Sequence, residues 1–327
     1  QVFNNLIGLL TAPIELRSIL KKGDYTHIIG GNTTFFSYIL PALLVSKINV
    51  IFRHGDQAPS HSWLHRFTNV LLFRRTDYHV FNCEFLRLKF DVGDEVGSSL
   101  IYNCPMRFDK SVESAGGIKS FNSATEIRLL FIGQLSEHKG IFVLMDAFRR
   151  LANADLRVSL DIVGAFPGYG SVVTQNVEGP LNELIASYPG RIIYHGFLDD
   201  PQSVFANADI VVVPSIWDDP SPNIVLEAKA FGLPAVGFPA GGIPEIIAHK
   251  VDGYVCKHAD VDSLVEGLEW MMSDLDRLGN IKKATYQNFI KNFGKERFSR
   301  EWLNVLQSVD FDTVVKSAVA KSTGPRL

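Results

Sequence analysis

The chain has 327 residues, of which 46% are hydrophobic and 20% are charged. This length favours two compact domains, and the composition excludes a disordered chain or a small scaffold held together by disulfides. The formal net charge of −3 provides no global positive field that could hold a nucleic-acid backbone. We therefore expect a globular protein of two domains that does not bind nucleic acid.

The three cysteines and the apolar runs indicate where in the cell the protein is located. Cys83, Cys104 and Cys256 are too far apart in the sequence for a CxxC site, and their number is odd. A disulfide framework is therefore not expected, and a reducing, cytoplasmic location fits best. The most apolar run, Tyr38–Ser46, is too short to span a bilayer.

Short β-branched runs alternate with helical periodicity, which predicts repeated βα units and parallel sheets. In the first third of the chain, the predicted strands are Tyr25–Ile29, Asn49–Phe52, Tyr78–Phe81 and Leu100–Tyr102. The predicted helices between them are Phe35–Val45, Trp63–Arg74 and Glu84–Phe90.

A second series of the same kind follows a predicted linker at 103–125, which is rich in serine and glycine. Its predicted strands are Arg128–Ile132, Ser159–Val163, Ile192–Tyr194, Ile210–Val213, Ala235–Gly237 and Tyr254–Cys256. Its predicted helices are Ile141–Ala152, Leu181–Ser187, Pro222–Phe231, Ile243–Ala248 and Val261–Met272, and the pattern stays helical to about Val309. We expect Rossmann-like domains at 1–115 and 116–290, with a C-terminal helix and tail at 291–327.

One predicted helix has clear signals at both ends. Ser221 is a good N-cap residue, Pro222 suits the first helical position, and Gly232 suits the position after the C-cap. The N-terminus of this helix follows strand Ile210–Val213, at the sheet edge where ligands bind in open α/β sheets. Glu227 lies within the helix among apolar residues, so its carboxylate needs a partner, and ligand hydroxyls would serve.

A second candidate segment runs from Gly133 to Lys139, between a strand and a helix. A glycine after a parallel strand allows a tight turn, and a lysine at the following helix start adds a charge that favours phosphate. By itself this pattern also describes an ordinary solvated lysine.

Several motifs together resemble the retaining glycosyltransferases of family 4. They are Gly133…Lys139-Gly140, Pro214-Ser215, Asp219-x7-Glu227, Phe231-Gly232-Leu233-Pro234 and Gly241-Gly242-Ile243-Pro244-Glu245. In the first domain, the run from Ile51 to Asp56 resembles the strand end that supplies an active-site histidine, and Ile101-Tyr102-Asn103 resembles the segment that closes that domain. The resemblance implies a GT-B fold, in which two Rossmann-like, doubly wound domains face a cleft and the C-terminal helices pack back toward the first domain.

The resemblance also implies roles for single residues in binding the donor. Lys139 would hold the donor diphosphate, in the same loop as Gly133 and Gln134. Glu227 would accept hydrogen bonds from the ribose, and the helix start at Asn223 and Ile224 would face the phosphates and the sugar.

Four further residues complete the implied site. Gly196 and Phe197 lie where the family's backbone meets the nucleotide base. His54 and Asp219 are the implied catalytic residues: His54 would lie against the donor sugar, and Asp219 would bind sugar hydroxyls. The alternative for His54 is a core histidine whose hydrogen bonds are satisfied at a strand end.

The sequence departs from the family pattern in three places. Gln134 stands where the family usually has arginine, which removes a charged phosphate contact, and Asp219 stands where glutamate is usual. The family's opening strand and glycine-rich loop have no counterpart before Gln1. We therefore expect a native polypeptide longer by about 70 to 90 residues, or a second chain that supplies the strand.

The predicted function is transfer of a sugar from a nucleoside-diphosphate sugar to a saccharide or lipid-linked acceptor, with retention and without a metal or cofactor. The alternative is a nucleotide-sugar-binding subunit that is not catalytic or depends on a partner. Residues 1–112 carry 12 Lys and Arg against 9 Asp and Glu. The segment Trp63–Arg75 alternates aromatic residues with Arg66, Arg74 and Arg75, so it predicts either peripheral contact with an anionic membrane or the buried stripe of a surface helix.

Overall fold

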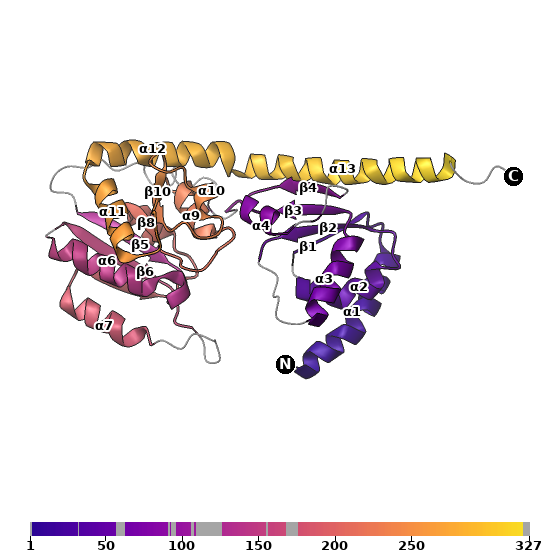
Figure 1. The fold of residues 1–327 in the computed structure, drawn as a ribbon, viewed down its shortest axis with the longest axis horizontal. Coiled ribbons are helices and arrows are strands. Elements are labelled where there is room, and N and C mark those ends of the chain that lie inside the picture. The colour runs from indigo at the N-terminus through magenta and orange to yellow at the C-terminus, as the bar shows by residue number, and fades with distance from the viewer. Residues whose placement is uncertain are drawn as a thin grey trace. The chain divides into compact units, whose positions relative to one another are not determined.

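The computed structural model describes residues 2–31, 33–56, 63–90, 92, 96–105, 108, 126–154, 156–167 and 176–322. Within these ranges, only the backbone is described at 2–10, 34, 35, 37, 63–66 and 310–322. The chain divides into two compact units, one formed by Gln1–Tyr102 with Phe298–Leu327 and the other by Asn103–Arg297. Each unit is built around one parallel sheet (Figure 1).

The first unit contains a four-stranded sheet with the order β1-β2-β3-β4. The strands are β1 (His27–Gly30), β2 (Asn49–His54), β3 (Tyr78–Phe81) and β4 (Gly97–Leu100). The helices are α1 (Val2–Lys22), α2 (Thr33–Leu43), α3 (Trp63–Arg75), α4 (Glu84–Lys89) and, from Phe298 onward, α13 (Lys295–Ser322).

Alternation along β2 distributes the core of the first unit over both faces of its sheet. Val50 and Phe52 pack with residues of α2 and α3, whereas Ile51 packs with Val305 and Val309 of α13. The same alternation directs His54 to the side of Phe52, which decides its surroundings.

The second unit contains a six-stranded sheet with the order β10-β9-β8-β5-β6-β7. The strands are β5 (Ile127–Ile132), β6 (Val158–Val163), β7 (Ile192–Gly196), β8 (Ile210–Val213), β9 (Ala235–Gly237) and β10 (Gly253–Val255). The helices are the 3-10 turn η1 (Glu137–Lys139), α6 (Ile141–Asn153), α7 (Glu178–Ser187), α8 (Gln202–Asn207), α9 (Asn223–Ala230), α10 (Ile243–Ile246), α11 (Val261–Met272) and α12 (Leu275–Asn292). The strand order reverses between β5 and β8, so the topological switch point of this doubly wound sheet lies there.

Two buried ion pairs, which the sequence analysis did not foresee, fix helices of the second unit. Lys229 Nζ in α9 donates to Asp252 Oδ2 at 2.5 Å, and Lys282 Nζ in α12 lies 3.3 Å from Asp209 Oδ1. Removing one partner of such a pair leaves a buried charge that costs about 3 to 5 kcal/mol. These lysines therefore have structural roles.

The α/β architecture with parallel sheets is confirmed, and several predicted elements have the expected bounds. The strand predicted at Leu100–Tyr102 is wrong, because β4 begins at Gly97 and ends at Leu100. Glycine and serine have low strand propensity, and pairing with β3 overrides it. Helices α1 and α8 were not predicted, and α13 continues past Val309.

The predicted linker falls mostly outside the described residues, and the domain boundaries at 115 and 290 stay predictions. Cys83, Cys104 and Cys256 form no disulfide within the described residues. Within the described part of the chain, no helix is both long enough and apolar enough to cross a membrane.

Candidate functional site

Glycine turns end three neighbouring strands at the carboxyl edge of the second sheet. Gly133 follows β5 and donates its N–H to the Val163 carbonyl at 3.0 Å, and Gly164 donates to the Gly196 carbonyl at 2.8 Å. A Cβ atom on Gly164, whose φ is +146°, would lie 1.8 Å from the Gly133 oxygen. The backbones therefore approach closely here, and a side chain at Gly164 would block the approach.

The loops after β5 and β8 meet at the switch point. Gly140 has φ +74°, and a Cβ atom there would lie 1.8 Å from the Pro214 carbonyl oxygen, so only glycine allows this approach. Directly before it, Lys139 Nζ donates to Asp219 Oδ2 at 2.7 Å. The structure thus brings together the residue predicted to bind phosphate and the residue predicted to bind sugar.

The Gly241-Gly242 pair supports the loop that carries Asp219. The Gly241 N–H donates to Asp218 Oδ1 at 3.1 Å, and the Gly242 N–H donates to the Asp219 carbonyl at 2.9 Å. Gly241 has φ +57°, and a Cβ atom there would lie 2.2 Å from that same carbonyl. These glycines therefore act by shaping the loop.

Helix α9 begins one residue later than predicted. Its N-cap is Pro222 and no side chain caps it, so the prediction of Ser221 as N-cap is wrong. The Ser221 Oγ is instead buried without a hydrogen-bond partner, because the extended backbone at Pro222 shifts the helix start. At the other end, Gly232 has φ +65° and the Leu233 N–H donates to the Ala228 carbonyl, which confirms the predicted C-terminal glycine motif.

The predicted ligand-binding residues of α9 lie at its start and in its second turn. Asn223 is exposed, and its Oδ1 accepts a hydrogen bond from Asn103 Nδ2 at 2.9 Å, a contact that the sequence did not reveal. Ile224 is half-buried in the first turn, and Glu227 is half-buried between Leu226 and Ala228, which are fully buried. The first-turn amides and the helix dipole favour an anion at this end.

The end of β7 is open. Gly196 has φ +69°, and among the described residues no atom lies within 4 Å of the point that a Cβ atom would occupy there; Phe197 is 70% exposed. Gln134 is also exposed after β5, on the same edge of the sheet. A flat aromatic ligand would find unobstructed backbone and an accessible ring there.

His54 lies in a different environment, inside the first unit. It is only 2% exposed, its Nε2 lies 2.8 Å from Nδ1 of His79, and its ring stacks on Phe81 at 4.2 Å between centroids. Burial, followed by the neighbouring His79, lowers the pKa of His54 to about 3, and burial lowers the pKa of His79 to about 4. Both rings are therefore neutral at pH 7, as in a paired core histidine, and a contact of His54 with a sugar stays a prediction.

The segment Trp63–Arg75 forms α3, which has both an exposed side and a side that packs on the core. Phe67 is 55% exposed and Arg74 is exposed, whereas Leu71 is half-buried and packs against the core of the first unit. Arg75 is not available to lipid, because its guanidinium donates to the carbonyls of Leu43, Ser46 and Ile48 and to Asp77. The side chains of Trp63 and Arg66 lie outside the described residues.

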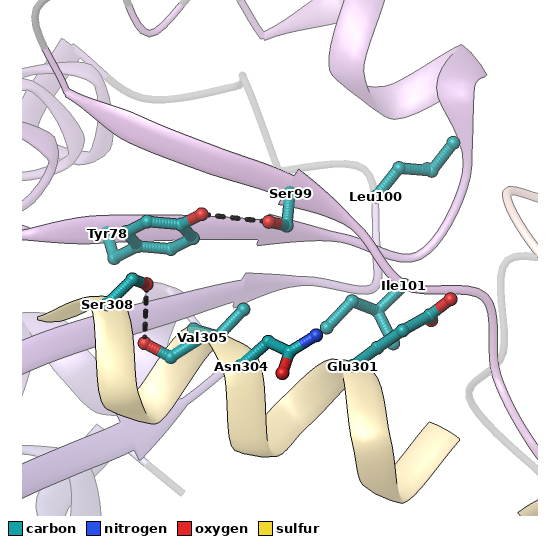
Figure 2. Close-up of a pocket in the computed structure, with 8 residues that line it drawn as sticks. All are labelled: Tyr78, Ser99, Leu100, Ile101, Glu301, Asn304, Val305 and Ser308. Atoms are coloured by element: carbon teal, nitrogen blue, oxygen red, sulfur yellow. Dashed lines mark hydrogen bonds between the residues drawn. The ribbon is translucent and has the colours of Figure 1, made fainter. Parts of the chain in front are cut away.

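Two other polar features of the described chain do not coincide with the predicted site. A pocket of about 350 Å³ in the first unit lies between β3, β4 and α13. Figure 2 shows its lining, which consists of Tyr78, Ser99, Leu100, Ile101, Glu301, Asn304, Val305 and Ser308.

In the second unit, Asp161 Oδ1 accepts a hydrogen bond from His195 Nε2 at 2.6 Å, and Asp161 Oδ2 lies 3.5 Å from Arg128 Nε. Over the described ranges, no three His, Cys, Asp or Glu side chains are arranged to hold a metal ion.

Comparison with known families identifies the family to which the residues of this sheet edge belong. Residues 118–288, just over half of the chain, match the family Glycosyl transferases group 1. The chain belongs to this family. The match covers Gly133, Lys139, Asp219 and Glu227, all in the second unit.

Similar proteins agree with this glycosyltransferase assignment. The chain is 30% identical over 180 residues to the uncharacterized glycosyltransferase MJ1607 of Methanocaldococcus jannaschii, covering 52% of this chain and 43% of that protein. It is 28% identical over 184 residues to a lipopolysaccharide 1,2-N-acetylglucosaminetransferase of Salmonella typhimurium, covering 55% and 46%. The chain thus aligns with about half the length of these curated relatives.

Solved structures show the fold of this chain. Anabaena Alr3699/HepE in complex with UDP has a TM-score of 0.74 at 20% identity, with 90% of this chain and 82% of that chain covered. Together with the two parallel sheets, this likeness shows the GT-B fold.

Proposed function

We infer that this chain is a retaining glycosyltransferase of family 4 that takes a sugar from a nucleoside-diphosphate donor bound by its second unit. The observation that carries the proposal is the meeting of Lys139, Asp219 and the start of α9 at the switch point of the second sheet. Ligands of doubly wound sheets bind at such a point.

Each chemical group of the donor has a proposed binding residue at this edge of the sheet. Lys139 and the dipole of α9 provide positive charge for the diphosphate, and Glu227 accepts from the ribose hydroxyls. Gly196 and Phe197 meet the base, next to the loop with Gly133 and Gln134. Because Lys139 is ion-paired with Asp219, a bound phosphate must share or displace that partner.

The proposed reaction breaks the bond between the sugar C1 and the diphosphate oxygen and forms a bond from C1 to an acceptor oxygen on the same face. The acceptor proton passes to the departing diphosphate. Lys139 and the helix start stabilise the charge that develops on that leaving group. No metal is required in this scheme.

Similar proteins suggest which donor and acceptor to test. Anabaena Alr3699/HepE is described in complex with UDP, which supports a uridine nucleotide as the first donor to test. The Salmonella typhimurium relative is named for lipopolysaccharide, which supports a saccharide or lipid-linked acceptor in polysaccharide or glycolipid synthesis.

Calorimetric titration with UDP, GDP and ADP tests the donor site. We expect one nucleotide diphosphate to bind, and Lys139→Ala to weaken it while the matched surface variant Lys257→Ala, at an exposed lysine of the same unit, does not. Failure of every nucleotide to bind the parent protein would overturn the proposal. Product formation with a saccharide acceptor, with the anomeric configuration read by NMR, then tests transfer and retention.

A second candidate is a nucleotide-sugar-binding subunit without turnover of its own. The burial of His54 against His79 favours it, because a ring enclosed by aromatic side chains contacts no sugar in that conformation. Normal donor binding without hydrolysis or transfer would select this candidate over the enzyme.

We also propose peripheral contact with an anionic cytoplasmic membrane through the outer face of α3. Phe67, Val70 and Arg74 share that exposed face, and each surface arginine contributes about 1 kcal/mol of attraction. Co-sedimentation with anionic vesicles is expected to fall for Phe67→Ser/Arg74→Ser and to stay unchanged for the control Arg149→Ser. Equal sedimentation of all three proteins would remove this contact.

A further inference from the structure

Trp217 is an exposed aromatic side chain in the loop between β8 and α9. Its side chain is 57% exposed, and the preceding Ile216 is 45% exposed. Burial of such a large apolar surface under a ligand would be strongly favourable, and the ring lies in the loop that carries Asp219, a residue of the proposed donor site.

The loop holds this ring in a fixed position. The backbone N–H groups of Ile216 and Trp217 both donate to the His138 carbonyl, at 2.9 and 3.3 Å. The indole meets the His138 ring edge to face, with centroids 5.3 Å apart. Lys139, next to His138, pairs with Asp219, so the same two segments are joined a second time.

Carboxylates follow the indole directly in the sequence and are also held in place. Asp218 Oδ1 accepts from the Gly241 N–H, and Asp219 Oδ2 accepts from Lys139 Nζ. The loop therefore carries a flat apolar ring and, within the next two residues of the chain, carboxylates that are held by hydrogen bonds. A site that needs no reordering loses little free energy when it binds.

This arrangement matches the chemistry of a pyranose ring. A pyranose has a face of C–H groups that stacks on an aromatic ring, and a rim of hydroxyls that donate to carboxylates. We propose that Trp217 is the stacking platform for a pyranose, with Asp218 and Asp219 on the hydroxyl rim. The inference rests on the proposed function, and the ring comes either from the donor sugar or from a saccharide acceptor.

The donor arm of the test compares UDP with UDP-glucose by calorimetry. Trp217→Ala is expected to weaken UDP-glucose about five- to tenfold and to leave UDP unchanged, whereas Trp217→Phe retains most of the affinity. Ile216→Ala is the matched control, because it removes an exposed apolar side chain from the same loop but leaves the ring. Thermal unfolding of each variant confirms that it folds.

The acceptor arm uses tryptophan fluorescence with maltose, with and without saturating UDP. If the pyranose that stacks on Trp217 comes from the acceptor, maltose changes the fluorescence emission of the parent protein and not of Trp217→Phe. In that case Trp217→Ala does not change the affinity for UDP-glucose. If neither ligand depends on Trp217, the inference is overturned. If UDP fails to bind the parent, the proposed function fails, while maltose fluorescence still decides whether Trp217 binds a saccharide.

Discussion

The carboxyl edge of the second sheet and the end of β2 in the first unit both carry residues predicted to act on the donor, yet they differ in exposure. Gln134, Phe197 and Asn223 reach solvent, whereas His54 is enclosed. The second unit thus has an exposed sheet edge that is shaped by its own backbone turns and charges. In the first unit, the corresponding residue serves an aromatic core.

This difference follows from how each residue is positioned. The position of Lys139 is fixed by the positive φ of Gly140 and by the close approach of the Pro214 carbonyl, which are both local features of the second unit. His54 is set by strand alternation, which directs it to the side of Phe52 and Phe81. Changes in the second unit should therefore affect ligands, and changes at His54 should affect stability.

The largest effect is expected where the site depends on close backbone approach. Gly140→Ala should reduce the free energy of unfolding of the second unit by about 3 kcal/mol, from left-handed strain and from a clash with Pro214. Gly190→Ala is the matched control. Gly190 has φ +78°, and in the described part of the chain nothing lies within 4 Å of a Cβ position there, so only the strain remains. Denaturant unfolding measures both variants, and equal losses would show that the approach at Pro214 is unimportant.

The histidine pair should make the first unit sensitive to acid. Because burial lowers the pKa of His54 and His79 in the folded state, the unfolded state binds more protons between about pH 4 and 6.5. The stabilisation by the neutral histidines is therefore fully present above about pH 6.5. It falls as the pH decreases, by up to about 4 kcal/mol at pH 5 for two histidines.

Thermal unfolding of the parent and of His54→Phe/His79→Phe from pH 7 to pH 5 measures this loss. The double variant keeps aromatic rings at both positions and should lack the additional acid sensitivity. Identical pH dependence of the two proteins would mean that the histidines are not buried as a neutral pair.

Substitutions in α9 and η1 should show which residue binds the nucleoside and which binds the diphosphate. Glu227→Ala should weaken both UDP and uridine, by about 2 kcal/mol for a lost charged hydrogen bond. Lys139→Ala should weaken binding of UDP but leave binding of uridine unchanged, because only UDP has phosphates that the Lys139 charge can attract. Calorimetry with both ligands checks this pattern, and unchanged affinity in Glu227→Ala would remove Glu227 from the site.

The smallest effect is expected at the exposed Gln134. Gln134→Arg should tighten UDP about tenfold, because a charged contact to phosphate replaces a neutral one, and should leave uridine unchanged. An equal change for UDP and uridine would place this loop away from the diphosphate.

The sequence predicted the second unit better than the first for physical reasons. Strands such as Ile210–Val213 are continuous β-branched runs, and α9 is followed by the left-handed Gly232, so local signals and tertiary structure agree. The start of β4 has no such signal, because Gly97 and Ser98 are paired only through β3.

At the candidate site too, the sequence predicted only what local motifs indicate. The motif around Lys139 and Asp219 predicted residues that the structure joins by an ion pair. The sequence did not reveal the contact of Asn103 with Asn223 or the pairing of His54 with His79, because each joins residues distant in the chain by side-chain geometry alone.

Hydrogen exchange with and without UDP tests most directly whether the second unit holds the donor. The proposal predicts slower exchange at Gly133–Gly140, at Gly196–Phe197 and from Pro214 through the first turn of α9, with no change in β2 or β3. Protection confined to the first unit, or no protection at saturating UDP, would contradict the assignment of the donor site to the switch point of the second sheet.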